Sequence, residues 1–144
     1  MKRRTSRGAA MIELAAVLVA CSMMLMACLN YGRLAMEGAV LDRAAADAAR
    51  YLAALPPEEL RDSARRGVVL ANAQAMLEQV LQDSGLQVLD LQTSYLCGAD
   101  TCAMVTSSNP LASMTVIAVL QYRDDWFGSG TLELRAQAEA SRGK

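Results

Sequence analysis

Residues 9–29 read AAMIELAAVLVACSMMLMACL. This run, the apolar span, determines the topology that we expect for the whole chain. Glu13 is its only charged residue. As an α-helix, the run would measure about 32 Å, which is close to the hydrocarbon thickness of a bilayer. The sequence therefore predicts a transmembrane helix over residues 9–29.

Charge is distributed unevenly on the two sides of the apolar span. The first eight residues carry Lys2, Arg3, Arg4 and Arg7 and no acid, whereas residues 9–144 carry all 15 acids. Basic residues beside a span stay in the cytoplasm. We therefore expect a single-pass inner-membrane protein with a cytoplasmic N-terminus and a periplasmic C-terminal domain. Because the basic arm leads directly into the span, contact with membrane lipid is favoured and nucleic acid is not expected.

The residue types argue against catalysis. The 144-residue chain contains no His, which removes the commonest general base and the commonest metal ligand. Triads that depend on His and most zinc sites are excluded, and no grouping of carboxylates or cysteines suggests another reaction. We expect no enzymatic activity, no catalytic residue, no cofactor and no metal.

Glu13 is the most informative residue of the apolar span. A lone carboxylate within a span costs at least ~2.5 kcal/mol, so it normally has a partner and a purpose. Glu13 lies five residues after Gly8. The alternative is a plain signal anchor, in which Glu13 is tolerated near the cytoplasmic interface.

Residues 7–13, Arg-Gly-Ala-Ala-Met-Ile-Glu, resemble the signal of type IV (class III) pilins. The likeness extends over residues 7–55 to the TadE/TadF-type minor pseudopilins of tight-adherence (Tad, or Flp) pili. Those proteins continue with an aromatic-Gly-Arg step and an Ala/Arg-rich helix, matched here by Tyr31-Gly32-Arg33-Leu34 and residues 44–51. The Met and Cys content of the span departs from the family, whose members favour Leu, Phe and Pro.

The resemblance implies a function and a set of partners. A prepilin peptidase would cut between Gly8 and Ala9, and Glu13 would neutralise the new N-terminal amine of a neighbouring subunit during assembly. A buried ion pair of this kind contributes little to stability, but it can fix the register between packed helices. The implied partners are the prepilin peptidase, other pilin and pseudopilin subunits and the inner-membrane assembly platform. The implied role is assembly or anchoring of adhesive pili, hence adherence and biofilm formation.

A lipoprotein is a competing interpretation of the same segment. Leu18-Val19-Ala20-Cys21 and Leu25-Met26-Ala27-Cys28 both fit the pattern L-x-A-C, in which the Cys is acylated. Cleavage before Cys21 would leave residues 22–29 as an exposed apolar segment, so Cys28 is the better candidate. The protein would then be an anchored envelope binding module with no pilus role. In the pilin interpretation, both cysteines are reduced packing residues of the span.

Beyond the span, apolar and small residues recur at alternating intervals of three and four, which predicts that the helix continues over residues 30–55. This seam consists of Tyr31, Leu34, Gly38, Leu41, Ala45, Ala48, Leu52 and Leu55. Its early members, Tyr31, Leu34, Gly38 and Leu41, are candidate contacts with other subunits. Alternatively, the seam packs on the chain's own domain, and both can hold for different parts of it. Pro56-Pro57 should end the helix.

Residues 56–144 predict a small α+β domain. A second helix should start at Pro57 and run to about Asp83, with Gly85 as its stop and an apolar face at Leu60, Ala64, Val68, Ala71, Leu77, Val80 and Leu81. Alternation with period two then predicts strands over residues 89–95 and 132–139, a short one over 103–107 and a central apolar one over 114–122. We therefore expect a pilin-like α+β fold: a long N-terminal helix, a second helix and a small antiparallel sheet of three or four strands.

Two features of this domain have competing interpretations. Outside the cytoplasm, Cys97 and Cys102 should form a disulfide across a hairpin, the alternatives being a redox pair or half a metal site. Trp126 and Phe127 either form an interface with another subunit or fold back onto the small core. Nearby acids and Asp100 suggest calcium, but their spacing fits no known loop.

Overall fold

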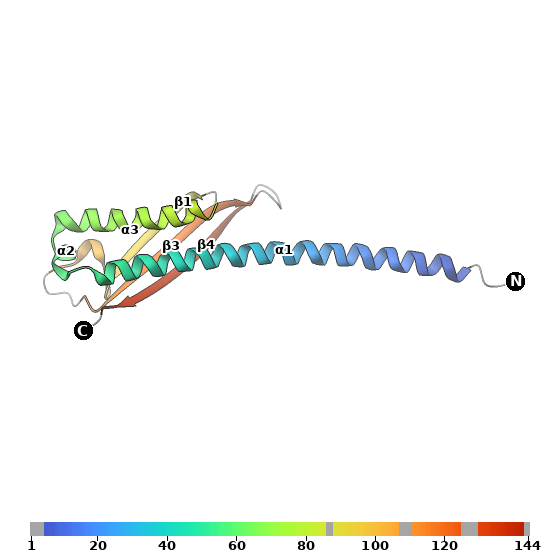
Figure 1. Ribbon diagram of the computed structural model, residues 1–144, viewed down its shortest axis with the longest axis horizontal. Coiled ribbons are helices and arrows are strands. Elements are labelled where there is room, and N and C mark those ends of the chain that lie inside the picture. Colours follow the sequence, from blue (N-terminus) through green and yellow to red (C-terminus); the bar gives the residue numbers. More distant parts are fainter. Residues whose placement is uncertain (1–4, 86–87, 107–110, 125–129, 143–144) are drawn as a thin grey trace. The chain divides into compact units, whose positions relative to one another are not determined.

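The computed structural model describes residues 5–85, 88–106, 111–124 and 130–142. It is an α+β protein with a long N-terminal helix, α1 (Thr5–Ala54), two further α-helices and one four-stranded antiparallel sheet (Figure 1). By internal contacts, the chain divides into a first unit, Met1–Met36, and a second, Glu37–Lys144. The predicted fold class is confirmed.

The last part of α1 belongs to the core of the second unit. The helix ends at Ala54, two residues before the first of the two prolines that were predicted to stop it. From Leu41 to Leu52 the seam is buried, since Leu41, Ala45, Ala48 and Leu52 are each at most 1% exposed, and Leu55 is partly buried. This part of the seam therefore packs on the chain's own domain.

The predicted second helix is interrupted. It consists of α2 (Pro57–Arg61) and α3 (Ser63–Asp83), separated by Asp62, whose backbone is extended. The Asp62 carboxylate accepts a hydrogen bond from the Ala64 backbone N–H at 2.9 Å and caps α3. The start at Pro57 and the stop at Gly85, which has a φ of +77°, are as predicted.

This interruption changes which face of α3 is buried. The core receives Val69, Ala73, Leu77 and Leu81, whereas the predicted core residue Val68 is 61% exposed and Ala64 and Ala71 are exposed. The predicted face assumed one unbroken helix from Leu60, and the break at Asp62 shifts the buried face in the first half of α3. Leu60, Leu77 and Leu81 are buried as predicted, and Val80 is partly buried.

The sheet has the strand order β2-β1-β3-β4, and all neighbouring strands are antiparallel. Three strands agree with the predicted ones: β1 (Val88–Cys97), β3 (Ser113–Asp124), which is central, and β4 (Gly130–Ser141). The short return strand differs, because β2 is only Asp100–Thr101 and a 3₁₀ turn, η1 (Cys102–Met104), follows it. The strand predicted over 103–107 was wrong in its described part, because η1 takes up residues 103 and 104 and residues 105–106 are irregular, while residue 107 lies outside the described residues.

One face of the sheet carries the core. Met114, Val116, Ala118 and Leu120 of β3 are fully buried, and they join α1, α2 and α3 residues in a single cluster. On β4, the alternating residues Leu134, Ala136 and Ala138 lie on this face, whereas Glu133, Arg135 and Gln137 are exposed. The second unit is thus a two-layer α+β domain with one open sheet face.

Candidate functional site

The first part of α1 presents its apolar side chains outward. Met11, Ile12 and Leu14 are 75%, 73% and 60% exposed, and the other large apolar residues up to Leu29 are at least half exposed. By length and composition, the helix can cross a membrane, with a mean hydropathy of 2.3 in its most apolar window, none of which is buried. Such a surface is stable only when lipid or other helices cover it.

The predicted processing and assembly residues lie on this one helix. Gly8 and Ala9 fall within its first turns, and Glu13 follows, exposed among apolar neighbours. The five-residue spacing corresponds to a rise of about 7.5 Å along the helix. A polar group in the same span, the Ser22 hydroxyl, is satisfied locally because it donates to the Leu18 carbonyl at 2.7 Å.

The candidate interface residues of the seam divide into two groups. Tyr31 is 74% exposed, and the neighbouring Met36, which sequence reasoning did not select, is 73% exposed. Leu34 and Gly38 are partly buried. Leu41, in contrast, is buried in the core of the second unit and is not accessible to a partner.

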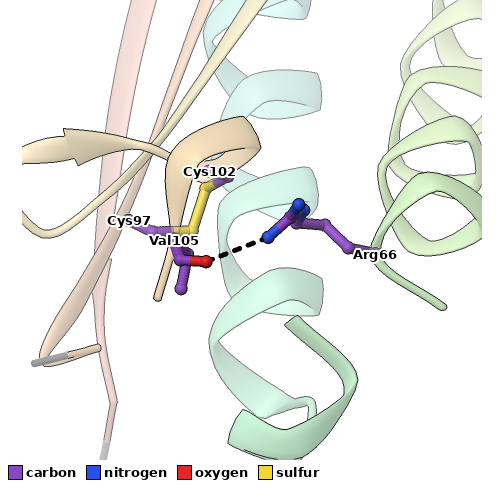
Figure 2. The surroundings of a disulfide bond; sticks show 4 residues. All are labelled: Arg66, Cys97, Cys102 and Val105. Atoms are coloured by element: carbon purple, nitrogen blue, oxygen red, sulfur yellow. Dashed lines mark hydrogen bonds between the residues drawn. A yellow bond between two sulfur atoms is a disulfide. The ribbon is translucent and has the colours of Figure 1, made fainter. Parts of the chain in front are cut away.

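Cys97 and Cys102 form the predicted disulfide, with a Cα–Cα distance of 4.9 Å. Both cysteines are buried, and the bond joins the end of β1 to η1. Three residues after Cys102, the Val105 carbonyl accepts a hydrogen bond from Arg66 of α3 at 3.1 Å (Figure 2). The disulfide and Arg66 therefore hold the same short segment, one from the sheet and one from the helix.

A second arginine, Arg142, fastens the end of α1. Its guanidinium donates hydrogen bonds to the carbonyls of Ala53, at 3.2 Å, and Leu55. Its backbone N–H bonds to the Ala112 carbonyl at 2.9 Å. The last carbonyls of a helix lack partners within the helix and favour a cation. Sequence reasoning missed this contact because nothing local links residues so far apart in the chain.

The remaining candidates are two aromatic residues, two cysteines of α1 and the acids considered for calcium. Trp126 and Phe127 lie outside the described residues. Cys21 and Cys28 are free and exposed on α1. Within the described ranges, no group of three or more Cys, Asp or Glu side chains is placed to hold a metal ion.

The chain matches no protein-family model, no curated protein and no solved structure. Its function is therefore inferred from its own residues.

Proposed function

We propose that this protein is a single-pass minor pseudopilin of the tight-adherence (Tad, or Flp) type. A prepilin peptidase removes residues 1–8, and the mature chain acts in assembly or anchoring of adhesive pili from the inner membrane. The observation that carries the proposal is Glu13, the only charge in an exposed, membrane-length apolar segment, five residues after Gly8.

The glycines of α1 support a helix–helix role. Gly32 and Gly38 lie within the helix, where Gly costs about 1 kcal/mol relative to Ala. A Cβ at either position would meet no atom within 4 Å, so the chain's own fold does not require their small size. Small residues allow helices to approach closely within membranes. Close packing of α1 against another subunit would explain both glycines.

The exposed seam residues agree with the same role. Tyr31 and Met36 present large apolar surfaces immediately beyond the apolar span, where a neighbouring subunit's helix would pack in a filament. Farther along, α1 is fixed in the domain core by Leu41 and Leu52.

The first test is the intact mass and N-terminal sequence of the protein extracted from the membranes of its native host. We expect a chain that begins at Ala9, and Gly8→Ala should leave it uncut at Met1. A chain that begins with a lipidated Cys28 would replace the pilin proposal with that of an anchored lipoprotein.

Glu13→Gln separates assembly from insertion. This variant keeps the size of the side chain and removes its charge, so we expect normal membrane insertion and cleavage but loss of assembled pili, because the neighbouring N-terminal amine lacks a counter-charge. Glu13→Asp, which retains the charge, is the matched control and should keep part of the assembly. Normal piliation of Glu13→Gln would contradict the role assigned to Glu13.

A further inference from the structure

Both lateral edges of the sheet are open in the part of the chain that the structure describes. β2 pairs with β1 only at Leu96 and Cys97, so the preceding residues of β1 have a strand partner on one side alone. At the opposite edge, the twelve residues of β4 pair only with β3 (Figure 1). Unpaired strand edges offer N–H and C=O groups to which a further strand can bond.

The two edges are compatible with each other. β1 and β4 are each antiparallel to β3, so they run in the same direction. If a second copy of the chain is shifted sideways without rotation, its β1 lies beside β4 of the first copy as a parallel neighbour. A shift without rotation also keeps every segment of both copies in the same orientation, which suits chains that enter one membrane from the same side.

We propose that the β1 edge of one copy pairs with the β4 edge of the next copy of this chain. The contact joins two different edges, so each copy in a pair still has one free edge. Further copies can bind there, and the pairing extends into a row rather than closing as a dimer. The inference does not rest on the proposed function, since it concerns the folded domain and applies equally to the uncut chain.

The side-chain pattern restricts the register of this contact. Leu91 of β1 and Leu134 of β4 both lie on the core face, and a slip of one residue between the copies would place a core-face side chain beside an open-face one. Only shifts by two residues keep the core faces together. The contact therefore has a small number of discrete registers.

Charge selects among these registers. Asp90 and Glu133 both pair with Gln121 of β3, so a purely lateral shift would bring these two acids side by side. A further shift of two residues places Asp90, the only charged residue of β1, beside Arg135, the only basic residue of β4. Both side chains are exposed. Opposite charges on adjacent strands stabilise the pairing, and like charges oppose it.

The same register covers an exposed leucine. Leu89 is 51% exposed at the β1 edge, where the ladder with β3 has an irregularity between Val88 and Asp90. In the register that joins Asp90 to Arg135, Leu89 comes beside the part of β4 around Leu134. Pairing of β4 with β4 of a second copy would leave Leu89 and the whole β1 edge uncovered. The two-edge contact therefore accounts for more of the exposed surface.

Cross-linking of the full chain in membranes tests the register. The background variant carries Cys21→Ser and Cys28→Ser, which remove the two free cysteines. Two probes, Gln92→Cys and Gln137→Cys, are then added, and in the proposed register they lie side by side across the contact. A short bis-maleimide should then yield a ladder of dimers, trimers and larger species. The matched control joins Gln92→Cys to Thr131→Cys, which lies about 20 Å from residue 137 along β4 and should give little product. Equal products from both pairs, or none from either, would overturn the proposal.

Single-cysteine and charge variants complete the test. Gln137→Cys alone should not cross-link, and dimers from it would show β4–β4 pairing instead. Asp90→Arg or Arg135→Asp should each lower the cross-linked fraction about fivefold, and the double reversal should restore it. Unchanged thermal unfolding midpoints would show that the variants remain folded. A ladder that is insensitive to the single reversals, or not restored by the double one, would contradict the pairing of Asp90 with Arg135.

Discussion

Tyr95 is the residue at which the environment of the domain changes an acid–base equilibrium. It is half-buried on the core face of β1. Burial raises the pKa of its hydroxyl above 10, the Thr93 side chain opposes this rise, and the negative charge of Glu78 on α3 adds to it. The neutral phenol is therefore favoured in the folded protein more than in the unfolded chain.

The raised pKa predicts a loss of stability at alkaline pH. Below about pH 10 the phenol is protonated in both states, and the free energy of unfolding does not depend on it. As the pH rises further, the unfolded chain releases the proton first, so the free energy of unfolding falls until the folded pKa is reached. Denaturant unfolding between pH 8 and 11 should show this fall, and Tyr95→Phe should reduce it. An equal fall in Tyr95→Phe would mean that Tyr95 is not its source.

At the scale of elements, Asp62 determines where α3 begins. Its carboxylate caps the Ala64 N–H, and the Arg65 guanidinium lies 3.7 Å away on the exposed surface. Asp62→Ala should lower the free energy of unfolding by about 1 kcal/mol, because one N–H at the helix start loses its acceptor. Asp62→Asn keeps an acceptor and loses only the exposed ion pair, so its cost should be smaller. Equal losses in the two variants, measured by urea unfolding, would show that the ion pair matters more than the cap.

The elements that sequence reasoning predicted are those with a long, uniform period. The end of α1 followed from Pro56 and Pro57, and β3 and β4 followed from their apolar and alternating patterns. The break at Asp62 was not predicted because residues 57–83 have helical composition throughout. Asp62 is nevertheless a residue type that caps helix starts, and this signal was available in the sequence. β2 escaped because two residues carry no period, and their pairing depends on the disulfide between Cys97 and Cys102.

The site residues divide in the same way. The Cys97–Cys102 disulfide was predicted correctly because two cysteines that bracket a turn are conspicuous in the sequence. Glu13 was selected as a charge in an apolar run, and its role in assembly stays a prediction. The contacts of Arg66 with Val105 and of Arg142 with Ala53 were not found. They join residues 39 and 89 positions apart, and such pairings depend on how the elements pack.

At the scale of the whole molecule, α1 has an exposed part and a buried part. Its residues from Leu41 to Leu52 form part of the domain core, whereas Tyr31 and the apolar span before it are exposed. The 3.5-residue period of the seam is the same from Tyr31 to Leu55, so the sequence alone could not show where exposure ends and burial begins. Burial supplies that boundary, near Glu37, where the second compact unit starts.

This division predicts opposite outcomes for two substitutions in the seam. Leu52 is fully buried, so Leu52→Ala should cost about 2–5 kcal/mol of domain stability and increase hydrogen exchange of the β3 amides. Tyr31 is 74% exposed, so Tyr31→Ala should change domain stability by less than about 0.5 kcal/mol. In the native host, Tyr31→Ala should nevertheless reduce pilus assembly while its domain remains folded, because the proposed helix contact loses its largest side chain. If Tyr31→Ala increased β3 exchange as Leu52→Ala does, Tyr31 would belong to the chain's own core, and the exposed part of α1 would have to end before Tyr31.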